Sequence, residues 1–362
     1  MADDSANRRG RARVRAIAAT LAAVLAVLVV LSVSVGDAGA YSVGDTLRGG
    51  AAWLGLAEPL DAAAQVILEA RLERTFLTIG VGAALALSGG MLQGVYRNDL
   101  ASPGLLGVTS GAALGASLAI LALGGYGPLF AFDHAGLGGA LFVTVCAFLG
   151  AAGVTAVVTA LGTTGGRVSI PTLLLVGIAM NAILGGLVSA IQSFALNDFE
   201  VARALFAWGF GNLDDRGAAM TGFVVAAVAI AALAIPFVAV ELDLFVAGED
   251  DARSLGVETG RVKWIALLSS ALAASAAVAV AGQIGFVGLI VPHLVRMAAS
   301  RSHRVLLPMC LLAGPVLLLG CEVVQRGLLQ ESALRPGVTM SLLGGPFFLV
   351  LLVRNRRRIQ AW

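Results

Sequence analysis

The sequence predicts an all-α polytopic membrane protein with about ten transmembrane helices and both termini in the cytoplasm. Three observations support this fold class. The mean hydropathy is +0.91 and only 13% of the residues are charged, whereas an exposed globular surface needs more charge. Most apolar runs are long enough to cross a hydrocarbon core of ~30 Å, which takes roughly 20 helical residues. The Arg residues are also divided unequally between alternate connectors.

Ten apolar runs account for the expected helices. They cover residues 16–36, 75–95, 105–123, 137–161, 171–194, 218–240, 264–282, 284–298, 305–324 and 338–353. Lipid offers the backbone no hydrogen-bond partners, so each run is expected to be helical. The eighth run is short and contains Gly285, Gly288 and Pro292, which makes it the weakest candidate. A single transmembrane domain then occupies 16–353, between basic cytoplasmic tails at 1–15 and 354–362.

The positions of Lys and Arg orient the chain. Ten spans place both termini on one side, and seventeen of the 24 Lys and Arg residues fall in segments on that side. The other seven are Arg48, Arg71, Arg74, Arg203, Arg216, Arg326 and Arg335. This bias follows the positive-inside rule, so the termini and the polar segment 248–264 are expected in the cytoplasm.

The N-terminal region has a second interpretation. An Arg-rich start, an apolar run and Ala38-Gly39-Ala40 are also typical of a cleaved signal peptide. The apolar core of such a peptide has only about 7–15 residues, fewer than this run. Cleavage would also put the two termini on opposite sides, so we expect a retained first span.

Small residues recur at four-residue spacing and predict close helix contacts, which supply association in lipid. They are Gly82, Ala86 and Gly90, then Gly111 and Gly115, then Gly139, Cys146 and Gly150. The three cysteines, Cys146, Cys310 and Cys321, form no CxxC pair and are expected to be core residues.

The fifth run carries a polar stripe. Gly177, Asn181 and Gly185 share one helical face, and Ser189 and Gln192 follow nearby. Polar groups at membrane depth face a partner helix or a cavity. Both interpretations stay open here: an interhelical hydrogen bond by Asn181, or a translocation path.

No motif for chemistry is present. The sequence contains no HExxH, GxSxG or GxxxxGK[ST], and its one lysine, Lys263, is not in a phosphate-binding loop. We therefore expect no catalytic residue, no metal ligand, no bound cofactor and no nucleic acid partner. Uphill transport would then need an ion gradient or another subunit.

The segment 248–264 is polar in an otherwise apolar chain. Glu249, Asp250 and Asp251 precede Arg253, which suits the dipole of a short helix. Gly256 can supply the left-handed residue that ends it, and 258–263 can begin a second helix. The segment is either a solvated connector or a surface presented to a cytoplasmic partner.

Four motifs resemble the FecCD family of ABC importer permeases, the type II importers for vitamin B12, haem and ferric siderophores. They are ARSLGV at 252–257, RNDLASPGLLGV at 97–108, GQIGFVGLIVPH at 282–293 and GGPFF at 344–348. The resemblance covers residues 65–358 and implies the inverted-repeat fold of that family. Segments 88–94 and 281–288 form a weak internal echo, which the expected topology places on opposite faces.

The resemblance implies several partners. The permease would be a homodimer that works with two ATP-binding ABC subunits, which use ATP and Mg, and with a periplasmic substrate-binding protein. The loop that docks on the ATPase would include Gly248, Ala252, Arg253, Ser254, Leu255 and Gly256. The receptor would dock on Arg71, Arg74 and Arg326, since the planar guanidinium suits a carboxylate.

The connector 195–217 is expected beside the outer mouth. Asn197 and Glu200 have capping-box spacing and predict a short surface helix. Trp208 is a candidate for lining the path with Asn181, Ser189 and Gln192. His134 also faces outward, and an iron contact by it is the weaker alternative to a structural role.

Some positions depart from the family pattern. Glu73 precedes Arg74 and is a candidate to neutralise it, Asn212 replaces a usual serine, and Arg335 stands before a displaced Pro336. Met340 occupies a common threonine position. The expected cargo is a ferric siderophore or haem, with cobalamin next. A secondary transporter is the rival class, but only Glu322 lies within a span, and ion coupling needs intramembrane acids.

Overall fold

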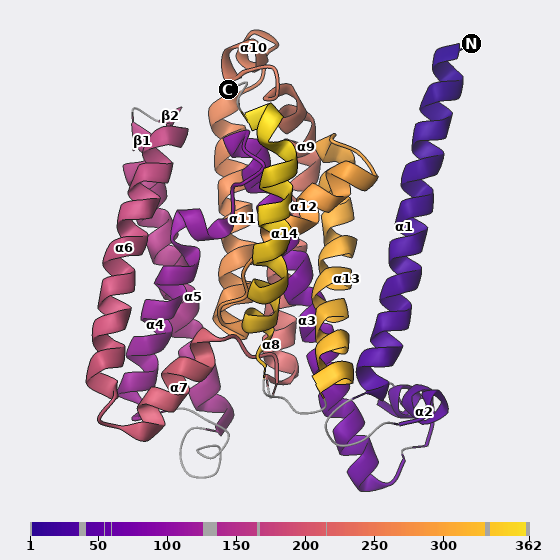
Figure 1. The fold of residues 1–362 in the computed structure, drawn as a ribbon, viewed down its shortest axis with the longest axis vertical. Helices are drawn as coiled ribbons and strands as arrows, with labels where there is room; N and C mark the ends of the chain where they lie inside the picture. Colours follow the sequence, from indigo (N-terminus) through magenta and orange to yellow (C-terminus); the bar gives the residue numbers. More distant parts are fainter. Residues whose placement is uncertain are drawn as a thin grey trace.

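The computed structural model describes residues 2–35, 41–53, 55–58, 60–125, 136–164, 167–214, 216–329 and 334–359, and these are almost entirely helical (Figure 1). The elements are α1 (Ala2–Ser34), α2 (Val43–Trp53), α3 (Ala62–Tyr96), η1 (Pro103–Leu106), α4 (Val108–Ala122), α5 (Gly136–Leu161), β1 (Thr163–Thr164), β2 (Arg167–Val168), α6 (Ile170–Ala195), α7 (Phe199–Gly209), α8 (Gly217–Ala232), α9 (Ile235–Leu244), α10 (Glu249–Ser254), α11 (Thr259–Ala281), α12 (Val287–Ala298), α13 (His303–Leu329) and α14 (Pro336–Ile359). The two short strands pair antiparallel as a hairpin.

The helices correspond to the ten predicted runs. Among the described residues, six helices are long and apolar enough to cross a membrane: α1, α3, α5, α6, α11 and α13. Helices α8 and α9 are bent by 51° at a short break, and the described residues contain up to seven such spans if this pair is counted as one. Helices α4, α12 and α14 are shorter apolar helices. The weakest predicted run is α12, which has 12 residues and Pro292 inside it.

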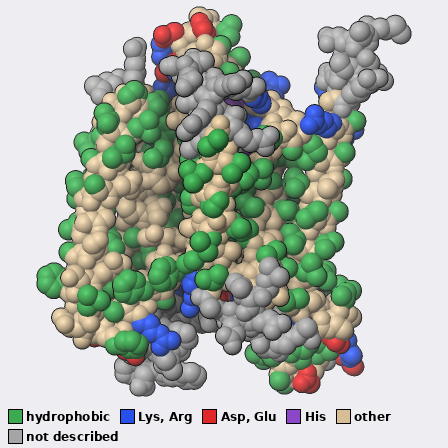
Figure 2. Space-filling model, viewed as in Figure 1, with side chains coloured by type: hydrophobic (Ala, Val, Ile, Leu, Met, Phe, Trp, Pro, Cys, Tyr) green, Lys and Arg blue, Asp and Glu red, His purple; other side chains and the backbone are tan. Residues whose placement is uncertain are grey.

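The two ends of the molecule are polar and its flanks are apolar. The N-terminus, the C-terminus and α10 all lie at one end, at the top of Figure 1, while α2 and α7 lie at the other. Hydrophobic side chains cover the flanks between these ends in Figure 2, and charged side chains gather at the ends. Both termini therefore share the end of α10, as the sequence predicts.

Glycine and proline mark several helix ends. Helix α3 ends at Arg97, which takes the left-handed conformation with φ 50°, and α4 begins after Gly107 with φ 77°. Pro171 occupies the first turn of α6, where a missing N–H leaves no helical hydrogen bond unmade. The sequence thus sets where the long helices turn.

The core is built on close helix contacts around α3, which is almost wholly buried between α11, α12 and α13. A Cβ on Gly82 would lie 2.7 Å from the carbonyl oxygen of Gly314, and one on Gly115 would lie 2.1 Å from that of Cys146. The predicted small-residue faces are therefore packing surfaces.

The two segments of the internal echo pack against each other, while the corners that they lead into lie toward opposite ends of the molecule. A Cβ on Gly89 would lie 1.9 Å from the Gly288 carbonyl oxygen. After the first segment, Arg97 lines a groove with residues of α10. At the second corner the Ala281 carbonyl accepts from the N–H of Asn212, in the connector that follows α7 at the other end. The two corners are therefore on opposite faces, as the sequence predicts.

Candidate coupling elbow and outer charge cluster

The polar segment folds as a helical elbow, defined here as residues 248–258. Gly248 has φ 135° and precedes α10, and Gly256 has φ 88° and follows it. Both angles favour glycine, because a Cβ strains such a backbone. The predicted helix and glycine corner are present. The second predicted helix is not separate, since α11 begins at Thr259 and runs on as the seventh span.

Ion pairs within the elbow hold its shape. Arg253 contacts Asp250 at 2.8 Å and Glu249 at 3.1 Å, and it donates to the Thr259 hydroxyl at 3.3 Å. Ser254 donates its hydroxyl to the Asp251 carbonyl at 2.7 Å. The contacts of the Arg253 side chain therefore stabilise the conformation of the elbow.

The elbow presents an apolar side chain to the outside. Leu255 is 68% exposed, while Ala252 is completely buried. A single exposed leucine is common on protein surfaces, so docking by Leu255 stays a prediction from the family resemblance. Of the six residues predicted for ATPase docking, Gly248 and Gly256 set the backbone conformation of the elbow. Ala252 packs into the core, and Leu255 is the exposed apolar residue.

Lys263 fixes the elbow to the membrane domain. Its ammonium lies 2.6 Å from Glu249 and donates to the Val168 carbonyl of β2 at 3.1 Å, although it is only 4% exposed. Partial burial alone would raise the pKa of Glu249. The hydrogen bond and charge of Lys263, a hydrogen bond with Thr259 and the charge of Arg253 outweigh that effect and hold the pKa below its usual range. The rarity of lysine is the one feature of the sequence that draws attention to this residue.

An open groove of about 740 Å³ lies between the elbow and the hairpin. Its lining residues are Arg97, Val168, Ser169, Gly248, Glu249, Asp250, Asp251 and Arg253. The groove brings the 97–108 motif beside the elbow. Two of the four family-like motifs are thus at the same end of the molecule.

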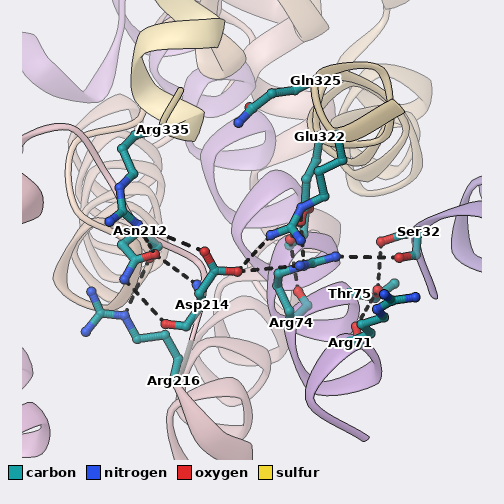
Figure 3. Close-up of polar contacts among 12 residues, drawn as sticks. Ser32, Arg71, Arg74, Thr75, Asn212, Asp214, Arg216, Glu322, Gln325 and Arg335 are labelled. Carbon is teal, nitrogen blue, oxygen red and sulfur yellow. Dashed lines mark hydrogen bonds and ion pairs between the residues drawn. The ribbon is translucent and has the colours of Figure 1, made fainter. Parts of the chain in front are cut away.

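At the opposite end, charged residues from distant elements form an outer charge cluster, defined as Arg74, Asp214, Glu322, Arg326 and Arg335 (Figure 3). Arg74 of α3 lies 2.6 Å from Glu322 of α13 and 3.5 Å from Asp214. Arg326 lies 2.8 Å from Asp214 and 3.5 Å from Glu322. The two carboxylates therefore bridge two arginines.

The cluster also joins two of the departures from the family pattern, Asn212 and Arg335. Arg335 donates to the Asn212 side-chain oxygen at 3.0 Å and lies 4.0 Å from Asp214. The backbone N–H of Asn212 in turn donates to the carbonyl of Ala281 at the end of α11, at 2.8 Å. The α7–α8 connector is thus bonded both to the start of α14 and to α11.

The three arginines predicted for docking do not all lie in one cluster. Arg74 and Arg326 belong to the cluster, whereas Arg71 donates to the carbonyls of Val33 and Ser34 and lies 5.2 Å from the centre of the Tyr41 ring. Arg71 and Arg74 are buried in the single chain. Asp214 is 39% exposed and is the most open carboxylate of the cluster.

The predicted path residues lie on α6 and α7. Asn181 accepts from the Ser110 hydroxyl at 2.6 Å and donates to the Gly104 carbonyl at 2.9 Å, so the interhelical interpretation holds for it. Ser189 is exposed and Gln192 is half-buried on the same helix. Trp208 is buried in the core.

The structure corrects one prediction for the outer side of the molecule and does not describe another. The short helix predicted there is α7, but Asp198 caps it, accepting from the N–H groups of Glu200 and Val201. Asn197 was the wrong capping residue, because the helix begins one residue later than its spacing suggested. His134 lies outside the described residues.

Comparison with known proteins gives a consistent result. The model of the FecCD transport family matches residues 21–354. The chain is 38% identical over 301 residues to the hemin transport system permease protein HmuU of Yersinia pestis, covering 82% of this chain and 86% of that protein. It is 39% identical over 298 residues to the cobalamin import system permease protein BtuC of Halobacterium salinarum, covering 80% and 74%.

A solved structure shares the fold. It is an ABC transporter ascribed to the metal-chelate type, in an inward-facing conformation. The TM-score is 0.75 at 28% sequence identity, and the match covers 94% of this chain and 99% of that chain.

Proposed function

The chain belongs to the FecCD transport family and is a multi-pass permease of the ABC importer type, and we propose that it moves an iron chelate, a ferric siderophore or haem, from the periplasm to the cytoplasm. The similarity to a hemin permease supports this cargo. Cobalamin is the second candidate, favoured by 39% identity to a cobalamin permease.

The observation that carries the transport mechanism is the elbow. It is a short helix between two positive-φ glycines, with internal ion pairs and an exposed leucine, at the end that holds both termini. Such a rigid projection suits docking in a cleft of a separate ATPase subunit. We therefore propose that ATP hydrolysis, with Mg, occurs in two partner subunits and drives a homodimer of this permease in a bacterial inner membrane.

The outer charge cluster is the proposed docking place of a periplasmic binding protein. Arg71, Arg74 and Arg326 would meet carboxylates on the two lobes of that receptor. Because Arg74 and Arg326 are already paired with Asp214, a receptor carboxylate would have to compete with this exposed side chain. Docking at such a rim would steer and orient the receptor more than tighten its binding.

The translocation path is proposed along α6, with Ser189 and Gln192, and near Trp208 of α7, while Asn181 on the same helix is bonded to Ser110 and Gly104. Glu322 gives little support to an ion-gradient mechanism, because it is held by Arg74, Arg326 and a hydrogen bond from Thr78. A proton or sodium carrier needs a carboxylate that is free to change its partner.

Uptake into proteoliposomes tests the proposal. The permease is reconstituted with its ATPase and receptor, and ATP-dependent uptake of haem, a ferric siderophore and cobalamin is compared. Replacement of Arg253 and Leu255 by aspartate should abolish uptake and loosen the ATPase in pull-downs, while Leu255→Met serves as the matched control. Accumulation of cargo without the ATPase would refute the proposal.

A further inference from the structure

The one lysine of the chain is placed where the elbow meets the membrane domain. Lys263 belongs to the first turns of α11, and its ammonium bonds Glu249 at the start of α10 and the Val168 carbonyl of β2. Three elements therefore converge on one side chain: the elbow helix, the hairpin and the seventh span.

The connection between α10 and α11 is short and carries backbone hydrogen bonds, of which one runs from the Val257 N–H to the Ala252 carbonyl at 3.1 Å. The two helices are joined by residues 255–258, which include Gly256 in a positive-φ conformation with no neighbouring atom within 4 Å of a built Cβ. Such a glycine can take several backbone conformations. Two side-chain contacts, Lys263–Glu249 and Arg253–Thr259, add direct links between the two helices.

Because the ammonium group of Lys263 is buried, it depends on its contact with Glu249. An ammonium that is 4% exposed needs a charged or hydrogen-bonding partner, because an unpaired buried charge is unfavourable. If the elbow moved away from α11, Lys263 would lose its only carboxylate partner among the described residues. The elbow is therefore expected to carry α11 with it.

The far end of α11 is bonded to the outer connector. The Ala281 carbonyl accepts from Asn212, two residues before Asp214 of the outer charge cluster. A Cβ on Gly282 would lie 2.4 Å from the Trp208 carbonyl oxygen, so this junction is also tightly packed. One continuous helix thus links the elbow to the outer connector.

We propose that Lys263 is a positioning residue that makes α10 and α11 move as one body, so that motion of the elbow on the ATPase reaches the outer connector through α11. This inference rests on the proposed ABC importer function. It adds a residue that acts within the permease, behind the docking surface.

The first test measures coupling in the reconstituted complex of permease, ATPase and receptor. The variants are Lys263→Met, Lys263→Arg as the conservative change, and the exchange of Lys263→Glu with Glu249→Lys. We expect Lys263→Met to keep ATPase binding and hydrolysis but to lower cargo taken up per ATP by about tenfold, a typical factor for coupling between two sites of one protein. Lys263→Arg and the charge exchange should restore much of the ratio.

Arg261→Met is the matched control, because Arg261 pairs with Glu258 at 3.7 Å on the surface, where the two side chains are 71% and 75% exposed. An unchanged ratio of uptake to hydrolysis in Lys263→Met would overturn the inference. Parallel loss of ATPase binding and uptake would also overturn it, since Lys263 would then only shape the docking surface.

The second test needs neither cargo nor ATPase, so it separates this inference from the proposed function. Hydrogen exchange of the backbone amides of α10 is measured in the purified permease. Lys263→Met should speed exchange across residues 249–254 while leaving α7 unchanged, and Arg261→Met should change neither. Wild-type exchange in α10 of the Lys263→Met variant would refute the positioning role.

Discussion

The Nε atom of Arg74 lies 2.6 Å from Oε1 of Glu322, and these two side chains, from α3 and α13, are only 7% and 5% exposed. Thr78 donates a further hydrogen bond to the same carboxylate at 2.8 Å. The pair joins two of the most closely packed helices of the core. Removing Glu322 would leave the buried Arg74 with only the longer ion pair to Asp214, at 3.5 Å, and removing Arg74 would leave Glu322 with Arg326 at 3.5 Å and Thr78.

Glu322→Leu is therefore expected to destabilise the fold by about 3–5 kcal/mol, the usual loss when one member of a buried ion pair is removed. Denaturant unfolding of the purified protein measures it. Glu258→Leu is the control, since its pair with Arg261 is on the surface, where such pairs contribute about 0–1 kcal/mol. Equal losses in the two variants would contradict the assignment.

Asp214→Asn tests whether the arginines of the outer charge cluster are held back from a receptor. The change removes the negative charge that faces Arg326 and Arg74. We expect the receptor to bind more tightly, and its binding to become more sensitive to salt, because exposed charges are screened.

The matched control is Asp61→Asn, an exposed acid at the start of α3 whose side chain makes no capping hydrogen bond. Titration of the receptor at two salt concentrations gives both quantities. Reversal of Arg71, Arg74 and Arg326 to glutamate should weaken capture. If capture is the same in all of these variants, the receptor does not dock on the cluster.

Gly89→Ala should destabilise the core, because the added methyl would meet the Gly288 carbonyl oxygen at 1.9 Å. Overpacking of this kind costs about 1–3 kcal/mol, and backbone cannot move aside as a side chain can. Thermal unfolding in detergent measures the loss. Gly153→Ala in α5, with open space around it, should be neutral or slightly stabilising.

The contact between Lys263 and Glu249 should depend on pH. Because the folded protein lowers the pKa of Glu249, the contact contributes fully above the ordinary Glu pKa of about 4.3 and is lost as pH falls through the lowered value. Hydrogen exchange in α10, corrected for intrinsic rates, should lose protection in that range. Lys263→Met should abolish this pH dependence, and its persistence would assign it to another group.

The local features of the fold could be predicted from the sequence. Apolar runs predicted the spans, and small residues at four-residue spacing predicted the helix contacts. The acids, Arg253 and Gly256 predicted the elbow. Each of these signals lies within one helix or one turn. Periodicity reports such features directly.

The ion pairs could not be predicted in the same way. Glu73 was the expected acidic partner of Arg74, but adjacent residues on a helix point in different directions. The structure instead brings Glu322 and Asp214 to Arg74, from elements far along the chain. Asn212 and Arg335 depart from the family pattern at distant positions of the sequence, and only the fold shows that they contact each other.

The enclosure of Lys263 also has a chemical use. As the only side-chain amine in the sequence, it is the one position in the described chain where an acylating reagent could leave a lysine adduct. While Lys263 stays buried, such a reagent cannot reach its amine. Mass spectrometry of the adduct would therefore record how often α10 separates from α11, without any introduced label.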